Sequence, residues 1–369
     1  MLEELRKKKV ALVHDYLVQD GGAERVLITL HEMFPSAPIF VLIHQPEATH
    51  MSLRDAKIIP SFLQNLPFAK THYQWTLPLM PMAIEHFDFS GFDLIVSSSS
   101  SFAKGIITPP GATHVCYCHT PTRFLWEERV NYIEDLPQLR FLRPILLPVL
   151  HNIRQWDKLA SLRPDRIVTN SNMSRTRISR YYGRDAEILP PPVETSLIPI
   201  GKGDGGYWLA GGRLVPYKKF DVVVRAFTKL NVPLKIFGTG PEEKKLRNMA
   251  GARVEFLGHV SDEERVRLYQ HAIGFLSPQI EDFGITIVEA MSAGCPVVTF
   301  QKGGGAEIVQ NGVTGIYLTR QAWEDIGDIV IRFDRSRFDS AVIRRHAEQY
   351  ASERFKQEFA RILSYAMDH

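Results

Sequence analysis

The hydrophobic positions in the first half of the chain fall into short runs separated by polar and glycine-rich segments. Short β-branched runs bounded by turn residues are typical of buried parallel strands, whereas apolar spacings of three and four are typical of helices. The run at residues 10–13 is followed by Gly21-Gly22 and then by a helical pattern from Ala23, which predicts the opening of a βαβ unit. In this half we expect strands at residues 10–13, 38–43, 92–97, 113–118 and 166–170.

A run of serines, residues 97–101, closes the third of these predicted strands. Serine after a parallel strand commonly serves as a turn or N-cap residue. We therefore expect a solvated turn there, and we favour it over a phosphate cradle.

The alternating pattern stops at Pro190-Pro191-Pro192 and restarts after the glycine-rich residues 201–206. Three prolines cannot continue a helix or a central strand, so we place a linker near residues 188–206. The second half then predicts a helix at 221–229, a helix opened by a capping box at Ser261–Glu264, and an amphipathic helical stretch at 340–369. Its predicted strands are at residues 207–212, 234–237, 254–257, 274–277 and 296–300.

Both halves are therefore α/β, and the 369 residues suit two domains of ordinary size. The expected fold is two doubly wound, Rossmann-like domains facing each other across a cleft. In such sheets ligands bind at the C-terminal ends of the strands, so we expect the candidate chemistry there.

Charge and cysteine content exclude several classes of protein. A net charge of +3 gives no case for nucleic-acid binding. The three cysteines, Cys116, Cys118 and Cys295, cannot form a disulfide framework, so we expect buried free thiols in a reducing compartment. No apolar run approaches about 18 residues, which predicts no membrane-spanning helix. No secretion signal follows the basic N-terminus, so we expect a cytoplasmic protein.

Cationic residues follow the first predicted strand of the second half. Gly211-Gly212 lets the backbone approach a ligand, and Arg213, Lys218 and Lys219 come next. Arginine can hold phosphate oxygens bidentately and lysine adds a point charge, which suits a diphosphate whose charge grows as a bond breaks. A solvated basic loop explains this segment equally well.

Further along the chain, the carboxylates of Glu281 and Glu289 lie on either side of the Phe283-Gly284 turn. If Gly284 opens a helix, the backbone N–H groups near Ile285 and Thr286 face an anion. Glu289 then lies about one turn inside the helix, where it could accept from ribose hydroxyls, and Glu281 could hold sugar hydroxyls. A surface loop with ordinary helix-start acids explains the pairing of these two carboxylates less well.

Three further segments carry weaker signals. Gly238-Thr239-Gly240 is neither a dinucleotide fingerprint nor a Walker loop, so a turn beside a nucleotide and a plain strand–helix turn are equally compatible. A lone strand-end histidine such as His119 is most often structural, but Arg123 and Trp126 close by suggest a shaped site with polar and aromatic walls. Gly21-Gly22 would let backbone approach a ligand from the other domain.

Taken together, these residues resemble the GT-B glycosyltransferases, specifically the large retaining family 4, over nearly the whole chain. The Glu281–Glu289 pair reproduces the E-x7-E motif of that family, including its usual Phe-Gly. Gly212–Lys218 looks like its diphosphate-binding Arg and Lys, with Lys218 a better match than Lys219. Glu194 stands where aspartate is usual, and we attach no functional consequence to it. Within that family the chain resembles a subgroup from bacterial polysaccharide clusters, many of whose members are named mannosyltransferases. The resemblance lies at residues 117–121 with Trp126, 154–157, 170–171, 181–185 and 191–193.

The resemblance implies an acceptor-side domain at residues 1–190, a donor-binding domain at 191–349, and a C-terminal helix, about 350–369, that crosses back to the first domain. It implies a nucleotide-sugar co-substrate, no other cofactor, no protein nucleophile and, without a D-x-D sequence, no essential metal. The implied catalytic residues are His119, Arg213, Lys218 and Glu281. The implied donor-binding residues are Gly22, Gly238, Gly240, Val260, Phe283, Gly284, Ile285, Thr286 and Glu289.

The expected activity is retaining transfer of a hexose from a UDP-glucose-type or GDP-mannose-type donor to a glycan or lipid-linked acceptor. A nucleotide-sugar epimerase of the same fold and a non-catalytic nucleotide-sugar binding module remain alternatives, and a dehydrogenase is weaker because the dinucleotide fingerprint is missing. Residues 139–154 are apolar and basic by turns, which suits either an anionic membrane surface or packing against the domain. We expect the prolines in this segment to prevent one long helix.

Overall fold

The computed structural model describes residues 1–19, 21–67, 72–127 and 143–368. They form two compact units. One comprises Met1–Pro192 together with Phe355–His369, and the other comprises Val193–Arg354.

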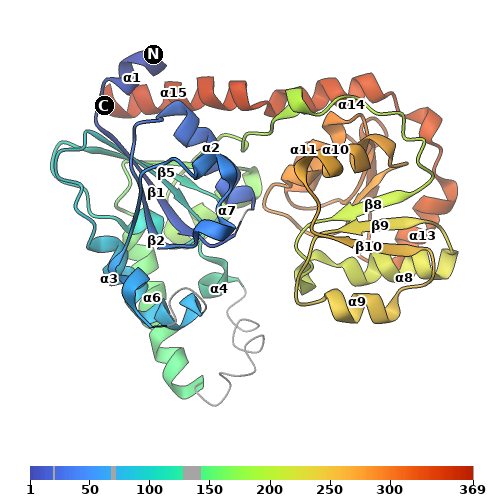
Figure 1. Ribbon diagram of the computed structural model, residues 1–369, viewed down its shortest axis with the longest axis horizontal. Coiled ribbons are helices and arrows are strands. Elements are labelled where there is room, and N and C mark those ends of the chain that lie inside the picture. Colours follow the sequence, from blue (N-terminus) through green and yellow to red (C-terminus); the bar gives the residue numbers. More distant parts are fainter. Residues whose placement is uncertain (20, 68–71, 128–142, 369) are drawn as a thin grey trace. The chain divides into compact units, whose positions relative to one another are not determined.

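Unit 1 is built on a parallel sheet of seven strands (Figure 1). The strand order is β3-β2-β1-β4-β5-β6-β7, so the direction of winding reverses between β1 and β4. Its strands are β1 (Val10–Leu17), β2 (Ile39–His44), β3 (Ile58–Pro60), β4 (Leu94–Ser99), β5 (Thr113–Cys118), β6 (Arg166–Thr169) and β7 (Glu187–Ile188). Its helices are α1 (Leu2–Arg6), α2 (Gly22–Met33), α3 (Met80–Glu85), α4 (Arg123–Trp126), α6 (Arg143–Ala160), α7 (Asn172–Tyr182) and α15 (Ser352–Asp368).

The two faces of this sheet bury separate cores because neighbouring residues of a strand point to opposite sides. On β1, Val10 and Leu12 join the core under α1, α2 and α15, whereas Ala11 and Val13 join the core under α3 and α6. Figure 1 shows α15 lying beside α1, with both chain ends at the same side of the unit. The prediction that the C-terminal helix returns to the N-terminal domain is confirmed.

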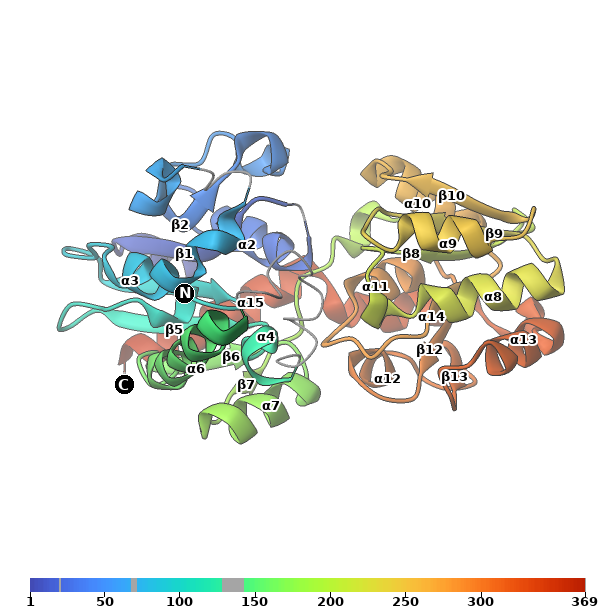
Figure 2. The same ribbon diagram turned by 90° about the horizontal axis from the view of Figure 1, so that it is seen from below.

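Unit 2 is a parallel sheet of six strands in the order β10-β9-β8-β11-β12-β13, which reverses between β8 and β11. Helices α8, α9 and α13 cover one face and α10, α11, α12 and α14 the other (Figures 1 and 2). The strands are β8 (Trp208–Gly211), β9 (Leu234–Phe237), β10 (Val254–Gly258), β11 (Phe275–Ser277), β12 (Val297–Phe300) and β13 (Gly315–Leu318). The helices are α8 (Phe220–Leu230), α9 (Glu243–Met249), α10 (Asp262–His271), α11 (Ile285–Ser292), α12 (Gly304–Ile308), α13 (Trp323–Arg332) and α14 (Ser340–Ala347).

The predicted class, two doubly wound α/β domains, is therefore confirmed. Local signals worked where a side chain caps the backbone: the Ser261 hydroxyl accepts from the Glu264 N–H at 3.1 Å and starts α10. They failed for the short strands β3 and β7, which have too few apolar residues to form a recognisable run, and β13 was also missed. The helical stretch at 340–369 is also interrupted, since an extended residue, Ala351, separates α14 and α15.

The prediction of a solvated turn at the serine run, residues 97–101, was wrong for its first three residues, whereas Ser100 and Ser101 are half-buried bends that leave the strand. Ser97, Ser98 and Ser99 lie inside β4 and are buried. Their hydroxyls have partners within the fold, so burial leaves them satisfied. Ser97 Oγ is 2.8 Å from His114 Nε2, and Ser99 Oγ accepts from a backbone N–H at 3.2 Å.

The expectation that prolines break the segment at 139–154 was also wrong for its described part, because α6 runs unbroken from Arg143 and contains Pro148. Residues 139–142 lie outside the described residues. Pro144 stands in the first turn, where the missing N–H has no partner in any case. Among the described residues, none of the helices has the length and hydropathy needed to cross a bilayer.

The buried ring of His114, on β5, predicts acid-sensitive stability. Its Nδ1 has no hydrogen-bond partner among the described residues, and desolvation with the nearby Arg163 charge lowers its pKa from 6.5 to about 3. The unfolded chain therefore binds more protons between these two values, and stability is lost as the pH falls from 6.5 towards 3.

We expect His114→Gln to lose less stability on acidification than the wild type. From pH 7 to pH 4.5 the difference should be about 2–3 kcal/mol, because each pKa unit corresponds to about 1.4 kcal/mol. Urea unfolding of both proteins at the two pH values measures it. Equal losses in the two proteins would contradict the prediction.

Candidate active site

In unit 1, polar residues gather where β1 and β4 end, at the reversal of strand order. Parallel sheets bind ligands at this position. The Asp15 carboxylate accepts four hydrogen bonds, at 2.6–2.8 Å, from the successive backbone N–H groups of residues 100–103. These bonds fix the chain that leaves β4 against β1. Asp15 thus has a structural role beside the glycine loop.

Two histidines flank Ser98 at this edge of the sheet. The Ser98 hydroxyl lies 2.9 Å from Nε2 of His119 and 3.2 Å from Nδ1 of His14. Burial alone lowers the pKa of His14, but the buried Glu24 carboxylate, 3.7 Å from its Nε2, together with Asp15 and the Ser98 carbonyl, outweighs burial and the pKa is raised. Desolvation and the His14 charge lower the pKa of His119 to about 3, so the His119 ring is neutral near pH 7.

The segment after His119 is held by a buried carboxylate on α6. Asp157 pairs with the buried ammonium of Lys104 at 2.6 Å. It also accepts from the Thr122 hydroxyl at 2.7 Å, the Trp126 indole at 2.7 Å and the Tyr182 hydroxyl at 2.9 Å. Buried charges need such partners, and these bonds tie the segment and α4 to α6 and α7.

In unit 2, three glycines allow two strand-end loops to approach each other closely. Gly212 and Gly238 have φ values of 128° and 104°, which L side chains rarely adopt. A Cβ on Gly238 would overlap the Gly212 carbonyl oxygen, and a Cβ on Gly240 would overlap that of Leu214. Glycine here is required by the backbone, whatever the loops bind.

We expect Gly238→Ala to destabilise the protein by roughly 2–4 kcal/mol, because backbone must move to admit the methyl group. Gly258→Ala is the matched control, since Gly258 also has a positive φ, 71°, but an added Cβ would meet no atom within 4 Å. Thermal unfolding of both variants checks this. Similar losses in the two would mean that φ alone, and not the contact, requires the glycine.

Two predicted catalytic residues of unit 2 contact each other directly. Lys218 ends a 3-10 turn, Pro216–Lys218, after β8, and its Nζ lies 2.9 Å from Oε1 of Glu281. Gln279 also donates to this carboxylate, at 2.7 Å. Both charged side chains are largely buried, with 13% and 15% of their surface exposed. Burial alone lowers the pKa of Lys218, but the charge and the hydrogen bond of Glu281, together with Tyr217, outweigh burial and the pKa is raised.

The Glu281 loop is packed against a second glycine loop, which follows β12. The Gly304 N–H donates to the Glu281 carbonyl oxygen at 2.8 Å, and Gly304 has no room for a Cβ next to Phe283. The Phe283 ring is buried against Tyr350. Gly284, with φ 114°, is the N-cap of α11. The turn and helix start expected from the sequence are therefore present.

Glu289 lies in the second turn of α11 and has partners that the sequence did not suggest. Arg265 forms an ion pair with it at 3.3 Å, and the Tyr269 hydroxyl donates to it at 3.0 Å. Both partners lie on α10, four residues apart and so on one face. The four-residue spacing of Arg265 and Tyr269 was the sequence signal for these partners, but many helices show the same spacing.

The remaining predicted site residues differ in their exposure. Gly22 and Arg213 are exposed, and the Arg213 side chain forms no hydrogen bond or ion pair with the described residues, although its backbone carbonyl accepts from the Val215 N–H at 2.9 Å. Ile285 and Thr286, at the start of α11, are half-buried. The Val260 side chain is buried in the unit 2 core, so only its backbone is free to meet a ligand.

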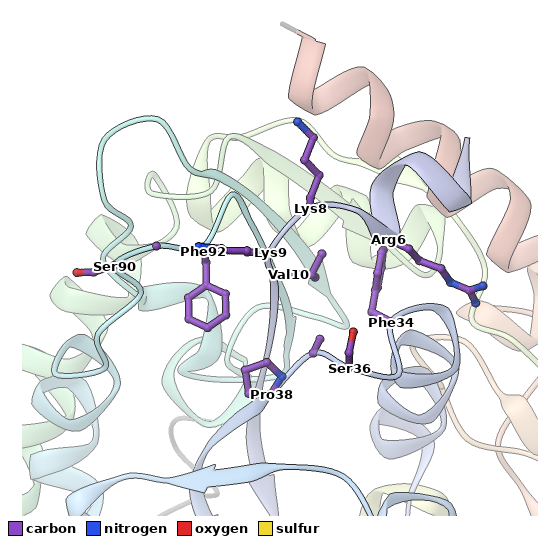
Figure 3. A pocket seen from close by; sticks show the side chains of 11 residues that line it. Arg6, Lys8, Lys9, Val10, Phe34, Ser36, Pro38, Ser90 and Phe92 are labelled. Carbon is purple, nitrogen blue, oxygen red and sulfur yellow. The ribbon is translucent and has the colours of Figure 1, made fainter.

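A hollow of about 340 Å³ in unit 1 lies at the opposite edge of the sheet (Figure 3). Val10, Pro38 and Phe92 line it, and they stand at or before the N-terminal ends of β1, β2 and β4. Because parallel sheets bind their ligands at the C-terminal edge, we do not assign the hollow to the candidate site.

Comparison with known sequences identifies both units. The family described as "Glycosyltransferase Family 4" matches residues 20–197, and "Glycosyl transferases group 1" matches residues 201–353. The D-rhamnosyltransferase WbpZ of Pseudomonas aeruginosa is 28% identical over 204 residues, which are 51% of this chain and 52% of that protein. The chain thus spans about half the length of the curated relatives that it matches.

Solved structures share the fold over nearly the whole chain. The Anabaena protein HepE, crystallised with UDP and glucose, superposes with a TM-score of 0.73 at 20% identity and covers 97% of this chain and 99% of its own. Sucrose-phosphate synthase from Thermosynechococcus elongatus gives a TM-score of 0.71 at 15% identity, covering 96% of this chain and 98% of its own. At these identities the likeness concerns the fold alone.

Proposed function

Because this chain belongs to the family 4, group 1 glycosyltransferases, we propose that it is a retaining hexosyltransferase. It moves a hexose from a nucleoside-diphosphate sugar, of the UDP-glucose or GDP-mannose type, to a glycan or lipid-linked acceptor. The observation that carries this proposal is the Lys218–Glu281 pair at 2.9 Å, held at the C-terminal edge of the unit 2 sheet beside Gly212 and Gly238. A cation for phosphate and a carboxylate for sugar hydroxyls meet there.

Lys218 and Arg213 bind the diphosphate of the donor in this proposal. The Lys218 ammonium has three N–H donors and gives one to Glu281, which leaves two for phosphate oxygens. The raised pKa of Lys218 keeps the ammonium charged at neutral pH. N–H groups at the start of α11, near Ile285 and Thr286, add further donors. These fixed charges stabilise the negative charge that grows on the leaving diphosphate.

Two carboxylates position the rest of the donor. Glu281 accepts from hydroxyls of the transferred sugar, helped by backbone N–H groups near Phe283. Glu289 accepts from the ribose hydroxyls, since each carboxylate oxygen has two acceptor positions and Arg265 and Tyr269 do not fill them all. Val260, Gly238 and Gly240 contribute backbone beside the nucleotide.

In unit 1, we assign to His119 a contact with the transferred sugar and to Gly22 a backbone contact with the donor. Substitution proceeds on one face of the sugar, with a donor phosphate oxygen assisting deprotonation of the acceptor. This route uses no protein nucleophile, no cofactor besides the nucleotide sugar and no essential metal. Among the described residues no three His, Cys, Asp or Glu side chains gather as metal ligands would.

We also propose that the protein transfers the sugar to its acceptor at the inner face of a membrane. The support for this is the exposure of apolar side chains on and just after α6, where Leu147 is 48%, Leu159 62% and Leu162 55% exposed. The basic residue Lys158 accompanies them on α6, which suits an anionic lipid surface. Co-sedimentation with anionic vesicles tests this part separately.

Incubation with UDP- and GDP-hexoses in the presence of a lipid-linked glycan mixture tests the central proposal. We expect release of one nucleoside diphosphate, an acceptor product with the anomeric configuration of the donor, and no effect of EDTA. An epimerised nucleotide sugar formed without acceptor would instead show an epimerase. Donor binding without turnover under every condition would show a binding module.

A further inference from the structure

Ser98 lies directly between His14 and His119. The serine is fully buried on β4, His14 is buried on β1, and half-buried His119 follows β5. The Ser98 hydroxyl contacts His14 Nδ1 at 3.2 Å and His119 Nε2 at 2.9 Å, and the Ser98 carbonyl oxygen is 3.1 Å from the same Nδ1. The direction of each hydrogen bond can be worked out from what each group is able to donate.

The chain of bonds starts at His14. A carbonyl oxygen only accepts, so the short contact with the Ser98 carbonyl requires a proton on Nδ1 of His14. That N–H is shared with the Ser98 hydroxyl oxygen, which accepts from it. Since His14 Nδ1 already carries a proton, the hydroxyl proton of Ser98 cannot be donated to it.

Within the described residues, the hydroxyl proton of Ser98 has one remaining acceptor, Nε2 of His119. A ring nitrogen that accepts carries no proton, so a neutral His119 ring must carry its proton on Nδ1. Nδ1 has no hydrogen bond to any described residue and is left as the donor that the ring can offer to a ligand.

We propose that Ser98 sets the tautomer of His119, so that this ring donates Nδ1–H to an oxygen of the transferred sugar. Ser98 and His14 are positioning residues, because they act through His119. The assignment of the sugar contact rests on the proposed function, whereas the tautomer does not. His119 then serves as a hydrogen-bond donor and does not serve as a general base.

Glu24 extends the chain of bonds to the glycine loop. One of its oxygens lies 3.7 Å from His14 Nε2, and the other accepts from the Gly21 N–H at 2.9 Å. Glu24 therefore holds His14 and the first residue of the Gly21-Gly22 loop together. The loop and the His119 ring are thereby connected by four successive contacts through three groups, Glu24, His14 and Ser98.

Long-range proton–nitrogen NMR spectra of the full chain, labelled in its histidine rings, read the tautomer without any substrate. His119→Asn identifies the His119 signals by their loss. We expect the proton on Nδ1 in the wild type and a shift towards the Nε2–H form in Ser98→Ala. A wild-type ring protonated on Nε2, or an unchanged spectrum in Ser98→Ala, overturns the proposal.

Two substitutions of His119 test which nitrogen meets the sugar. Asparagine places its amide nitrogen as many bonds from Cβ as Nδ1, whereas glutamine places it as many bonds as Nε2. We expect His119→Asn to keep a kcat/KM roughly tenfold above that of His119→Gln, the size of one well-made hydrogen bond. The reverse order would show that Nε2 meets the sugar and would overturn the proposal.

Ser97→Ala is the matched control for Ser98→Ala. It removes an equally short serine–histidine hydrogen bond, to His114, from the same strand but from a ring outside the site. We expect about a tenfold fall in kcat/KM for Ser98→Ala and wild-type turnover for Ser97→Ala. Equal losses would overturn the positioning role. If no donor is turned over by the wild type, the proposed function fails, and the NMR result still decides the tautomer.

Discussion

Lys218→Ala should lower kcat for sugar transfer roughly 100- to 1000-fold, the usual cost of removing one group that stabilises charge in a transition state. The variant loses the ammonium that we propose to bind the leaving diphosphate, and it removes the Lys218–Glu281 ion pair. Because the positive charge acts mainly on charge that develops during the reaction, kcat should fall more than the affinity for the donor. Steady-state kinetics with the preferred donor measure both.

Lys219→Ala is the control beside it. Lys219 carries the same charge one residue further on but makes no ion pair among the described residues, and its left-handed backbone, φ 57°, suits alanine no worse than lysine. We expect wild-type kcat from this variant. Wild-type kcat from Lys218→Ala, or a comparable loss from Lys219→Ala, would contradict the assignment of Lys218.

Asp157→Ala should destabilise the protein by about 3–5 kcal/mol, because it leaves the Lys104 ammonium buried without a counter-charge. Only 3% of the Lys104 side chain and 1% of Asp157 are exposed. The substitution also removes the acceptor for Thr122, Trp126 and Tyr182, so the segment after His119 loses its anchor. Urea unfolding followed by fluorescence and by circular dichroism measures the loss.

Two further variants complete this test, one within the Asp157 cluster and one at an exposed ion pair. Asp157→Asn keeps the shape and should fall between alanine and the wild type. Glu358→Ala removes an exposed ion pair with Arg361 and should leave the unfolding midpoint unchanged. If Asp157→Ala is no less stable than Glu358→Ala, the buried pair does not contribute as proposed.

That Lys218 and Glu281 lie at one edge of the unit 2 sheet could be predicted because each follows a strand in a fixed order along the chain. Lys218 and Glu281 are 63 positions apart, by subtraction of their numbers, yet each follows a strand of one parallel sheet, and strand ends meet at one edge. Their direct contact and the Gly304 loop beneath Glu281 could not be predicted, since both depend on how loops pack after folding.

The residues that contact the predicted site residues could not be predicted from the sequence. Tyr269 and Arg265 contact Glu289 from another helix, and nothing in their own segment distinguishes them from ordinary helix residues. Ser98 was misread for a different reason. Serine is usually exposed, and only the two histidines from neighbouring strands make its burial favourable.

The path of the chain through the two units constrains the order in which the protein can fold as it is synthesised. The core of unit 1 includes Phe355, Phe359 and Leu363 of α15, all almost completely buried. Unit 2, in contrast, is one continuous segment, Val193–Arg354. A ribosome therefore releases every residue of unit 2 before it releases the helix that completes unit 1. The unit that is begun first is finished last, and until α15 emerges the part of the core that this helix covers, beside α1 and α2, stays exposed.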